Sequence, residues 1–208
     1  MFKIFIFPLS LIVLSGTVLP APSVARLAIS GAITPPTCTL NGQTEETYFY
    51  HFDISPGIFP ANGNLILRPQ TQNIEVICDA TTYLTFIATD ERAGTELVTG
   101  SNNYGLGTYN MNTKTGYFAV RVDNVTVKSH ADASTVPAGI IKYGVFNDFA
   151  LLGKNVLLTL ATVTGQPAAA QIFAADFTIT PTINGALKDS TGDAALDGLV
   201  VLTFAFGL

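Results

Sequence analysis

The chain has 208 residues, a net charge of −5 and only 12% charged residues. A sparsely charged, acidic chain lacks the basic surface that binds nucleic acid or anionic lipid, so we expect neither as a partner.

The first 25 residues have the pattern of a secretory signal peptide. Lys3 supplies a positive start, residues 4–14 form an apolar core, and Ser23-Val24-Ala25 offers a cleavage site of small residues. The apolar run is too short to predict a membrane span. We therefore expect residues 1–25 to be removed and residues 26–208 to form one large domain, with two small domains as the alternative.

The stretch that follows the cleavage site alternates with a period of two, which is typical of a β-strand. One face of this expected strand carries Leu27, Ile29, Gly31 and Ile33. Gly31 leaves space for another backbone to approach closely. Pro35 and Pro36 then end regular pairing. We expect this strand to be the part of the molecule that meets its neighbours.

Cys38 and Cys78 are the two cysteines of the chain. A single even pair in an exported protein is expected to form a disulfide, and two separate thiols are the alternative. Closing a loop of about 41 residues should stabilise the fold by about 4 kcal/mol.

Short apolar alternations separated by turn residues fill the rest of the chain, and no long amphipathic helix is predicted. The expected strands cover residues 47–54, 72–78, 83–88, 117–127, 156–163, 176–183 and 199–208. Cys78 is expected at the end of its strand, facing the core. Pro181 implies that the strand expected at 176–183 borders the sheet or ends near Pro181. This spacing predicts an all-β fold, a β-sandwich of roughly seven to ten strands.

The last expected strand is the most apolar. One of its faces carries Val200, Leu202, Phe204, Phe206 and Leu208. An open hydrophobic edge would aggregate, so we expect this strand to be paired and covered.

Two connections have informative polar residues. Residues 89–95 read as a turn in which Asp90 accepts from nearby backbone donors, with Arg92 available as its partner. Residues 165–171 read as a loop.

The sequence offers no catalytic or metal-binding pattern. His51 and His130 have no metal-ligand spacing. The Lys114-Thr115-Gly116 triplet lacks the Ser-x-x-Lys nucleophile that accompanies it in penicillin-binding enzymes. We therefore expect no enzyme and no cofactor.

Six segments, taken in order, resemble a known family: ISGAITPPTC, IEVICDA, TDERAGT, YGLG, KTGYFAV and LDGLVVLTF. They resemble subunits of bacterial chaperone-usher fimbriae. More closely, they resemble the pilin-like family of unknown function whose members are called probable β-fimbrial subunits. The matches cover nearly all of the chain after the expected signal peptide.

The resemblance implies an immunoglobulin-like, pilin-type β-sandwich that lacks its final strand. In such subunits a periplasmic chaperone fills the gap first, and the N-terminal strand of the next subunit then replaces it. The implied donor residues are Leu27, Ile29 and Ile33, with Gly31 at the close-approach position. The implied groove wall, which pairs with the chaperone strand, is Val200, Leu202, Phe204 and Phe206.

The implied partners are a periplasmic chaperone, an outer-membrane usher and neighbouring fimbrial subunits, and the implied location is a fimbria on the cell surface. The chain departs from the family in two places. Cleavage after Ala25 leaves only residues 26–30 ahead of Gly31, and the chain ends in Phe206-Gly207-Leu208 where the family has a penultimate aromatic residue.

Two other functions remain open at this point. The protein could be a tip adhesin, whose ligand site would lie in loops such as 101–107 or 129–139. It could also be a self-complete secreted β-sandwich, a stable monomer that needs no chaperone and could be an enzyme.

Overall fold

The computed structural model describes residues 25–32, 34–190 and 194–207. Residues from Thr34 onward form one compact unit, and the residues before it belong to a separate unit. The expected signal peptide, apart from Ala25, lies outside the described residues, as do Ile33 and Leu208.

The compact unit is all-β, as the sequence pattern predicts. Its strands are β1 (Cys38–Leu40), β2 (Leu65–Ile66), β3 (Gln70–Asp90), β4 (Tyr104–Gly105), β5 (Thr108–Tyr109), β6 (Thr113–Lys114), β7 (Gly116–Lys128), β8 (Val136–Lys142), β9 (Val145–Asn147), β10 (Ala150–Leu151), β11 (Leu158–Thr162), β12 (Ala169–Ile183) and β13 (Val200–Gly207). Two short 3₁₀ helices, η1 (Pro56–Ile58) and η2 (Gly185–Asp189), lie in the connections.

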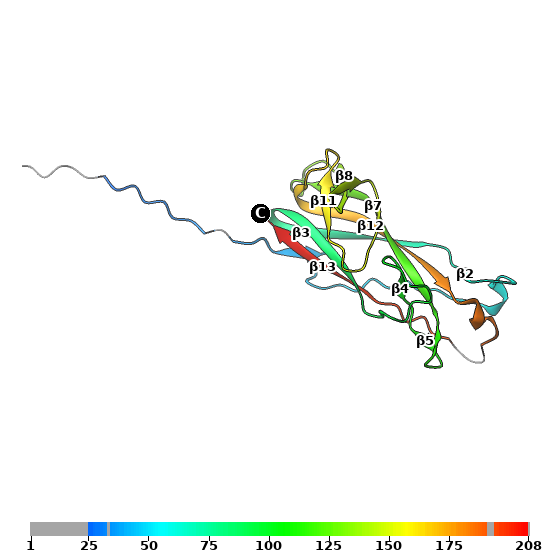
Figure 1. Ribbon diagram of the computed structural model, residues 1–208. Helices are drawn as coiled ribbons and strands as arrows, with labels where there is room; N and C mark the ends of the chain where they lie inside the picture. Colours follow the sequence, from blue (N-terminus) through cyan, green and yellow to red (C-terminus); the bar gives the residue numbers. More distant parts are fainter. Residues whose placement is uncertain (1–24, 33, 191–193, 208) are drawn as a thin grey trace, which may run out of the picture. The chain divides into compact units, whose positions relative to one another are not determined.

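Antiparallel pairing joins eleven of the described strands into one sheet, and β5 and β6 pair with each other. The main path runs β1-β3-β11-β8-β7-β12-β2. Because β12 also pairs with β3, the path from β3 through β11, β8, β7 and β12 returns to β3. Among the described strands, β1 and β13 pair with β3 alone and stand outside this closed path, and Figure 1 shows β13 running beside β3.

Strand β3 is continuous over 21 residues, where the sequence pattern indicates two strands. Its first half pairs with β12 as far as Ile77, and the pairing resumes at Thr82. Between these two positions β3 has four residues and β12 has only Gln171. Such a bulge bends the strand and lets it form a corner. The prediction that a strand ends at Cys78 is therefore wrong, although Cys78 is buried with Ile74 and Val76 as expected.

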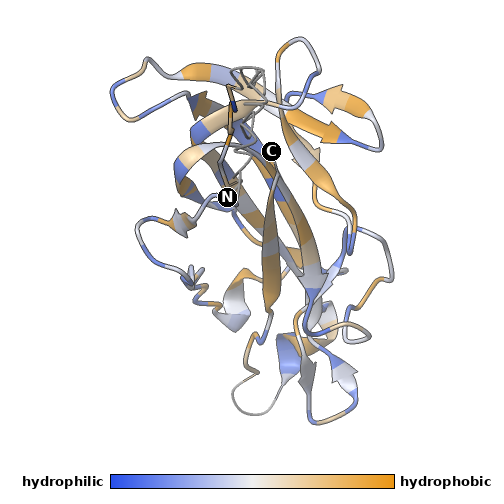
Figure 2. Ribbon diagram, turned by 90° about the vertical axis from the view of Figure 1, so that its left-hand side faces the viewer, coloured by the Kyte–Doolittle hydropathy of each residue, from blue (hydrophilic) through white to orange (hydrophobic). Residues whose placement is uncertain are grey.

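Alternate apolar side chains of the long strands are buried in the core. In β7 these are Phe118, Val120 and Val122, with Val125 buried beyond them, and in β12 Phe177 and Ile183 are buried. Colouring by hydropathy shows apolar segments along the central strands and polar ones in many of the connecting loops (Figure 2). Burial on one face is sufficient to explain why these residues form strands.

The structure confirms one of the two alternatives predicted from Pro181, because β12 ends at Ile183, two residues after it. Strand β12 is not at a border: it pairs with β7 along most of its length, including Pro181 with Phe118. On the opposite edge β2 pairs only with the last two residues of β12. The backbone N–H of Leu67 donates to the carbonyl of Pro181 (3.0 Å). The backbone N and C=O of one residue point to the same edge of a strand, so the nitrogen of Pro181 also faces the β2 side. The ladder between β2 and β12 ends there, so no hydrogen bond is lost because proline has no N–H.

Two other predicted boundaries are wrong. The loop expected at 165–171 ends early, because β12 begins at Ala169. Residues 47–54 form no strand, although alternate side chains of this segment pack against the core. The side-chain amides of Gln70 and Gln72 donate to the carbonyls of His51 (2.6 Å) and Phe49 (2.7 Å). These bonds replace a backbone ladder along this segment.

Candidate functional site

The C-terminal strand β13 has a partner on only one edge. It pairs with β3 from Val200 opposite Asp90 to Gly207 opposite Tyr83. At Tyr83, β3 pairs with Gly207 on one edge and with Ala169 of β12 on the other. Among the described residues, no strand pairs with the second edge of β13. The predicted pairing of the last strand is therefore confirmed on one side only.

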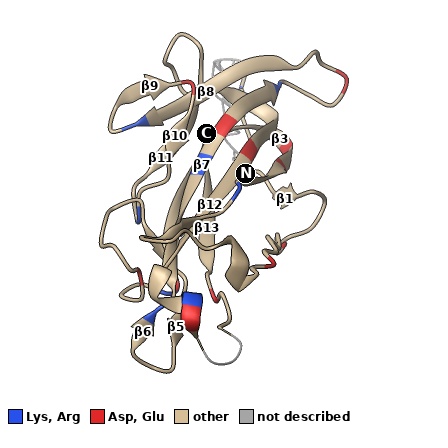
Figure 3. Ribbon diagram, turned by 90° about the vertical axis from the view of Figure 1, so that its right-hand side faces the viewer, with Lys and Arg blue, Asp and Glu red and all other residues tan. Residues whose placement is uncertain are grey.

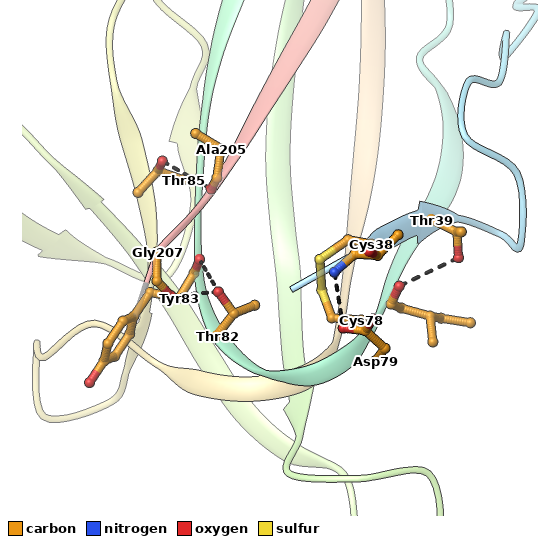
Figure 4. Close-up of a disulfide and its surroundings, with 11 residues drawn as sticks. Cys38, Thr39, Cys78, Asp79, Thr82, Tyr83, Thr85, Ala205 and Gly207 are labelled. Carbon is orange, nitrogen blue, oxygen red and sulfur yellow. Dashed lines mark hydrogen bonds between the residues drawn. A yellow bond between two sulfur atoms is a disulfide. The ribbon is translucent and has the colours of Figure 1, made fainter. Parts of the chain in front are cut away.

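The direction of the backbone groups in β13 follows from one hydrogen bond at its start. The N–H of Glu91 donates to the carbonyl of Leu199 (3.0 Å), so Leu199 faces β3. Backbone groups of successive strand residues point to opposite edges. Backbone groups therefore point to the open edge at Val200, Leu202, Phe204 and Phe206. This assignment agrees with the hydroxyls of Thr85 and Thr82, which donate to the carbonyls of Ala205 (3.3 Å) and Gly207 (2.5 Å) on the β3 side (Figure 4).

The side chains of the same residues face the core. Val200, Leu202 and Phe204 are half-buried and pack against the core cluster, whereas Phe206 remains 36% exposed. The Phe204 ring lies 5.5 Å from the ring of Phe86, which in turn lies 6.0 Å from that of Phe177. The predicted apolar face of β13 thus covers the core over its first five residues and becomes exposed toward its end.

A small apolar cavity of about 10 Å³ adjoins Phe204. Its walls come from both halves of β3 and from β11, β12 and β13: Ile74, Val76, Leu84, Phe86, Leu160, Phe173, Ala174, Ala175, Phe177 and Phe204. This volume is about the minimum that one water molecule requires, so the cavity is too small for a side chain. A side chain could enter beside β13 only if Phe204 moved.

The disulfide predicted between Cys38 and Cys78 is present, with an S–S distance of 2.08 Å. It joins β1 to the first half of β3, where Ile77 pairs with Thr39 on one edge and with Ile172 of β12 on the other. β1 and β13 therefore lie along the same edge of β3, one on each side of its corner (Figure 4).

The segment expected to act as a donor strand has no secondary structure in its described part, residues 25–32. Leu27 and Ile29 are 97% and 101% exposed, and no atom lies within 4 Å of the position that a Cβ would take at Gly31. The predicted strand is absent here because a strand requires a partner for its backbone groups. The donor role of these residues remains a prediction, and Ile33 lies outside the described residues.

The turn after β3 is only partly as expected. The N–H of Arg92 donates to Oδ1 of Asp90 (2.9 Å), as predicted. The Arg92 side chain, however, forms two hydrogen bonds to Asp197 (2.8 Å each) and not to Asp90. These hydrogen bonds raise the pKa of Arg92 and lower the pKa of Asp197. Lys154 is the partner of Asp90 (3.0 Å), a contact over 64 residues that no local pattern signals.

The loops considered for an adhesin differ in accessibility. Tyr104 to Gly107 are buried, and Tyr104 and Gly105 pair with β7, so 101–107 presents little surface. Most of residues 129–137 are exposed. Charged residues are few and scattered over the ribbon (Figure 3). Within the described ranges, no group of three His, Cys, Asp or Glu side chains could hold a metal ion.

The chain matches no protein-family model and no curated protein sequence. In the part of the chain that the structure describes, no helix has the length and apolar character needed to cross a membrane.

Proposed function

We propose that the protein is a structural subunit of a bacterial chaperone-usher fimbria that polymerises by donor-strand exchange for surface adhesion. On this proposal the fold is an immunoglobulin-like, pilin-type sandwich that is completed by a strand from another molecule. The observation that carries the proposal is the open edge of β13: alternate residues of this strand direct their backbone groups away from β3, and the side chain of one of them, Phe204, borders an apolar cavity.

An added strand would use two sets of contacts. Its backbone would hydrogen-bond with the outward groups of Val200, Leu202, Phe204 and Phe206, which provides affinity with little sequence dependence. Its alternate side chains would enter between β13 and the core, which sets the register. Because the existing cavity is so small, insertion requires the half-buried Phe204 ring to move away from Phe86. A periplasmic chaperone would supply the first such strand.

The proposed donor is the segment that contains Leu27, Ile29, Gly31 and Ile33. Burying one Leu and one Ile that are now fully exposed would contribute roughly 1.5–3 kcal/mol each. Insertion into a second copy is a heterologous contact, so repeated insertion yields a filament and not a closed dimer. The outer-membrane usher and neighbouring subunits are the remaining proposed partners, and the cell surface is the proposed location.

The test is an unboiled SDS gel of the periplasmic protein, produced with and without a co-expressed fimbrial chaperone. Boiled samples and a variant that lacks residues 26–33 are run beside it. We expect a ladder of multimers that collapses on boiling and is absent from the deletion variant. A soluble monomer that is indifferent to both the chaperone and the deletion would contradict the proposal.

A further inference from the structure

A lysine and two carboxylates meet in the interior at the end of β3, where Asp90 lies opposite the first residue of β13. The Nζ of Lys154 lies 3.0 Å from Oδ2 of Asp90 and 2.8 Å from Oε1 of Glu96. The side chains of Asp90, Glu96 and Lys154 are only 1%, 9% and 18% exposed. Strand exchange does not use these three residues.

Backbone contacts hold both Asp90 and Lys154 in place. Oδ1 of Asp90 accepts from the N–H of Arg92 (2.9 Å) and Oδ2 from the N–H of Gly105 (3.1 Å). A Cβ at Gly105 would lie 2.2 Å from the carbonyl oxygen of Arg92, so only glycine allows this approach. The N–H of Lys154 donates to the carbonyl of Ser101 (2.8 Å). The Lys154 amine and the Asp90 carboxyl group are therefore held at contact distance by the fold, which removes most of the entropic cost of a reaction between them.

Two buried polar atoms beside this contact lack a hydrogen-bond partner within the described structure. They are Oε2 of Glu96 and the hydroxyl of Tyr104, whose side chain is fully buried. An unpaired buried oxygen is costly, and such atoms call for an explanation. The Tyr104 ring stacks on Phe118 (5.4 Å) and lies 6.0 Å from Nζ of Lys154. These rings make the surroundings apolar, which favours neutral groups over charged ones.

We propose that Lys154 and Asp90 condense to form an intramolecular amide bond, with Glu96 as the catalytic proton carrier. The cluster has the three parts that this reaction needs: an amine, a carboxyl group that accepts from two backbone donors, and a second carboxylate in contact with the amine.

The reaction balances without any added reagent. A proton passes from the Lys154 ammonium to the Asp90 carboxylate, which leaves a neutral amine and a neutral acid. Oδ2, the oxygen nearest to Nζ, takes this proton and becomes the departing hydroxyl. The nitrogen lone pair attacks Cγ of Asp90, and the N–H of Arg92 stabilises Oδ1 as it becomes negative. Glu96 accepts a proton from the nitrogen and delivers it to the departing hydroxyl. One water leaves, a C–N bond replaces a C–O bond, and Glu96 is again a carboxylate.

The unreacted cluster is an ion pair, so proton transfer must precede attack. Burial lowers the pKa of the Lys154 amine, but hydrogen bonds to Glu96 and Asp90 outweigh burial and raise it overall. The transfer takes place over a contact of 3.0 Å inside an apolar enclosure. Condensation is therefore expected to follow folding and to be absent from unfolded protein.

The experiment is an intact-mass measurement of the folded, full-length mature protein, followed by peptide mapping. We expect the mass to fall below that of the disulfide-bonded sequence by one water molecule, and we expect a branched peptide that joins Lys154 to Asp90. Protein with the full sequence mass would overturn the proposal. A branch at Glu96 would overturn the roles assigned to the two carboxylates.

Three variants separate the chemistry from the ion pair. Lys154→Arg keeps the positive charge but cannot form the amide, so the mass deficit should disappear while the protein still folds. Glu96→Gln should abolish or slow the loss of water. Lys142→Arg is the matched control, because Lys142 donates to the carbonyl of Leu151 and should leave the deficit unchanged. A deficit that persists in Lys154→Arg would also overturn the proposal.

Discussion

Removing the disulfide tests the account of how β1 is held beside β3. The cysteines are 40 positions apart, so the bond closes a loop of 41 residues counted with both ends. In the chain-entropy relation, such a loop restricts the unfolded chain by about 13 cal/mol/K, or about 4 kcal/mol at 25 °C. Losing about 4 kcal/mol of stability is a large part of the 5–15 kcal/mol that typically separates folded from unfolded domains. We therefore expect the Cys38→Ala/Cys78→Ala double variant to be about 4 kcal/mol less stable.

The measurement is urea unfolding of residues 26–208 and of the same chain with both cysteines replaced, followed by fluorescence or circular dichroism. Reduced wild-type protein is the matched control, because Cys38 and Cys78 form the one disulfide that the sequence allows. The reduced wild-type protein should lose the same free energy of unfolding as the double variant, without any change in core volume. Without the bond, β1 would keep three paired residues and the two hydrogen bonds between Thr37 and Asp79. A loss of less than about 1 kcal/mol in both samples would refute the loop-entropy argument.

Three further predictions concern the open edge, the donor segment and acid stability. Leu202→Pro removes an N–H that points away from β3, so it should block multimers while the chain still folds. Thr203→Pro removes an N–H that bonds to β3, so it should destabilise the fold by about 1–3 kcal/mol. Equal effects of the two variants on urea unfolding would contradict the assigned edge. Ile29→Asp should abolish multimers on unboiled gels, because insertion would bury an unpaired charge. The neighbouring Ser30→Asp should be tolerated. Multimers of the Ile29→Asp variant would count against insertion of this segment beside β13. Because the hydrogen bonds from Arg92 lower the pKa of Asp197 in the folded state, this pair stabilises the fold above the unfolded pKa of Asp and the gain is lost as pH falls through the folded pKa. Asp197→Asn should therefore lower stability at neutral pH and flatten its acid dependence, and an unchanged pH profile of thermal unfolding would exclude this contribution.

Local alternation was a good guide to the faces of the strands. Cys78 faces the core as predicted, and the alternating Phe118, Val120 and Val122 are all buried. A side chain in a strand points to one face or the other with a period of two, so the pattern of apolar residues reports which face is covered. The pairing of the two cysteines was also predictable, because a chain with a single pair of cysteines can form only one intramolecular disulfide.

Strand boundaries and partners were harder to predict. The corner in β3 depends on how β12 pairs with it, so the sequence around Cys78 reads as a strand end. Pro181 indicates a border by its missing donor, but the structure places that donor position where β2 ends. Arg92 lies next to Asp90 in the chain, yet its side chain bonds to Asp197, which is 105 positions away.

The candidate site likewise combines a feature that could be predicted from the sequence with one that could not. The apolar alternation of Val200, Leu202, Phe204 and Phe206 could be read directly from the chain, because it is a property of consecutive residues. The open edge of β13 could not be predicted from consecutive residues, because the hydrogen-bond partners of a strand come from segments far away in sequence. β13 pairs with residues that precede it by more than 100 positions, and the absence of a partner on its other edge depends on the course of all the other described strands. Residue pattern therefore specified the face of β13, and long-range backbone pairing specified its free edge.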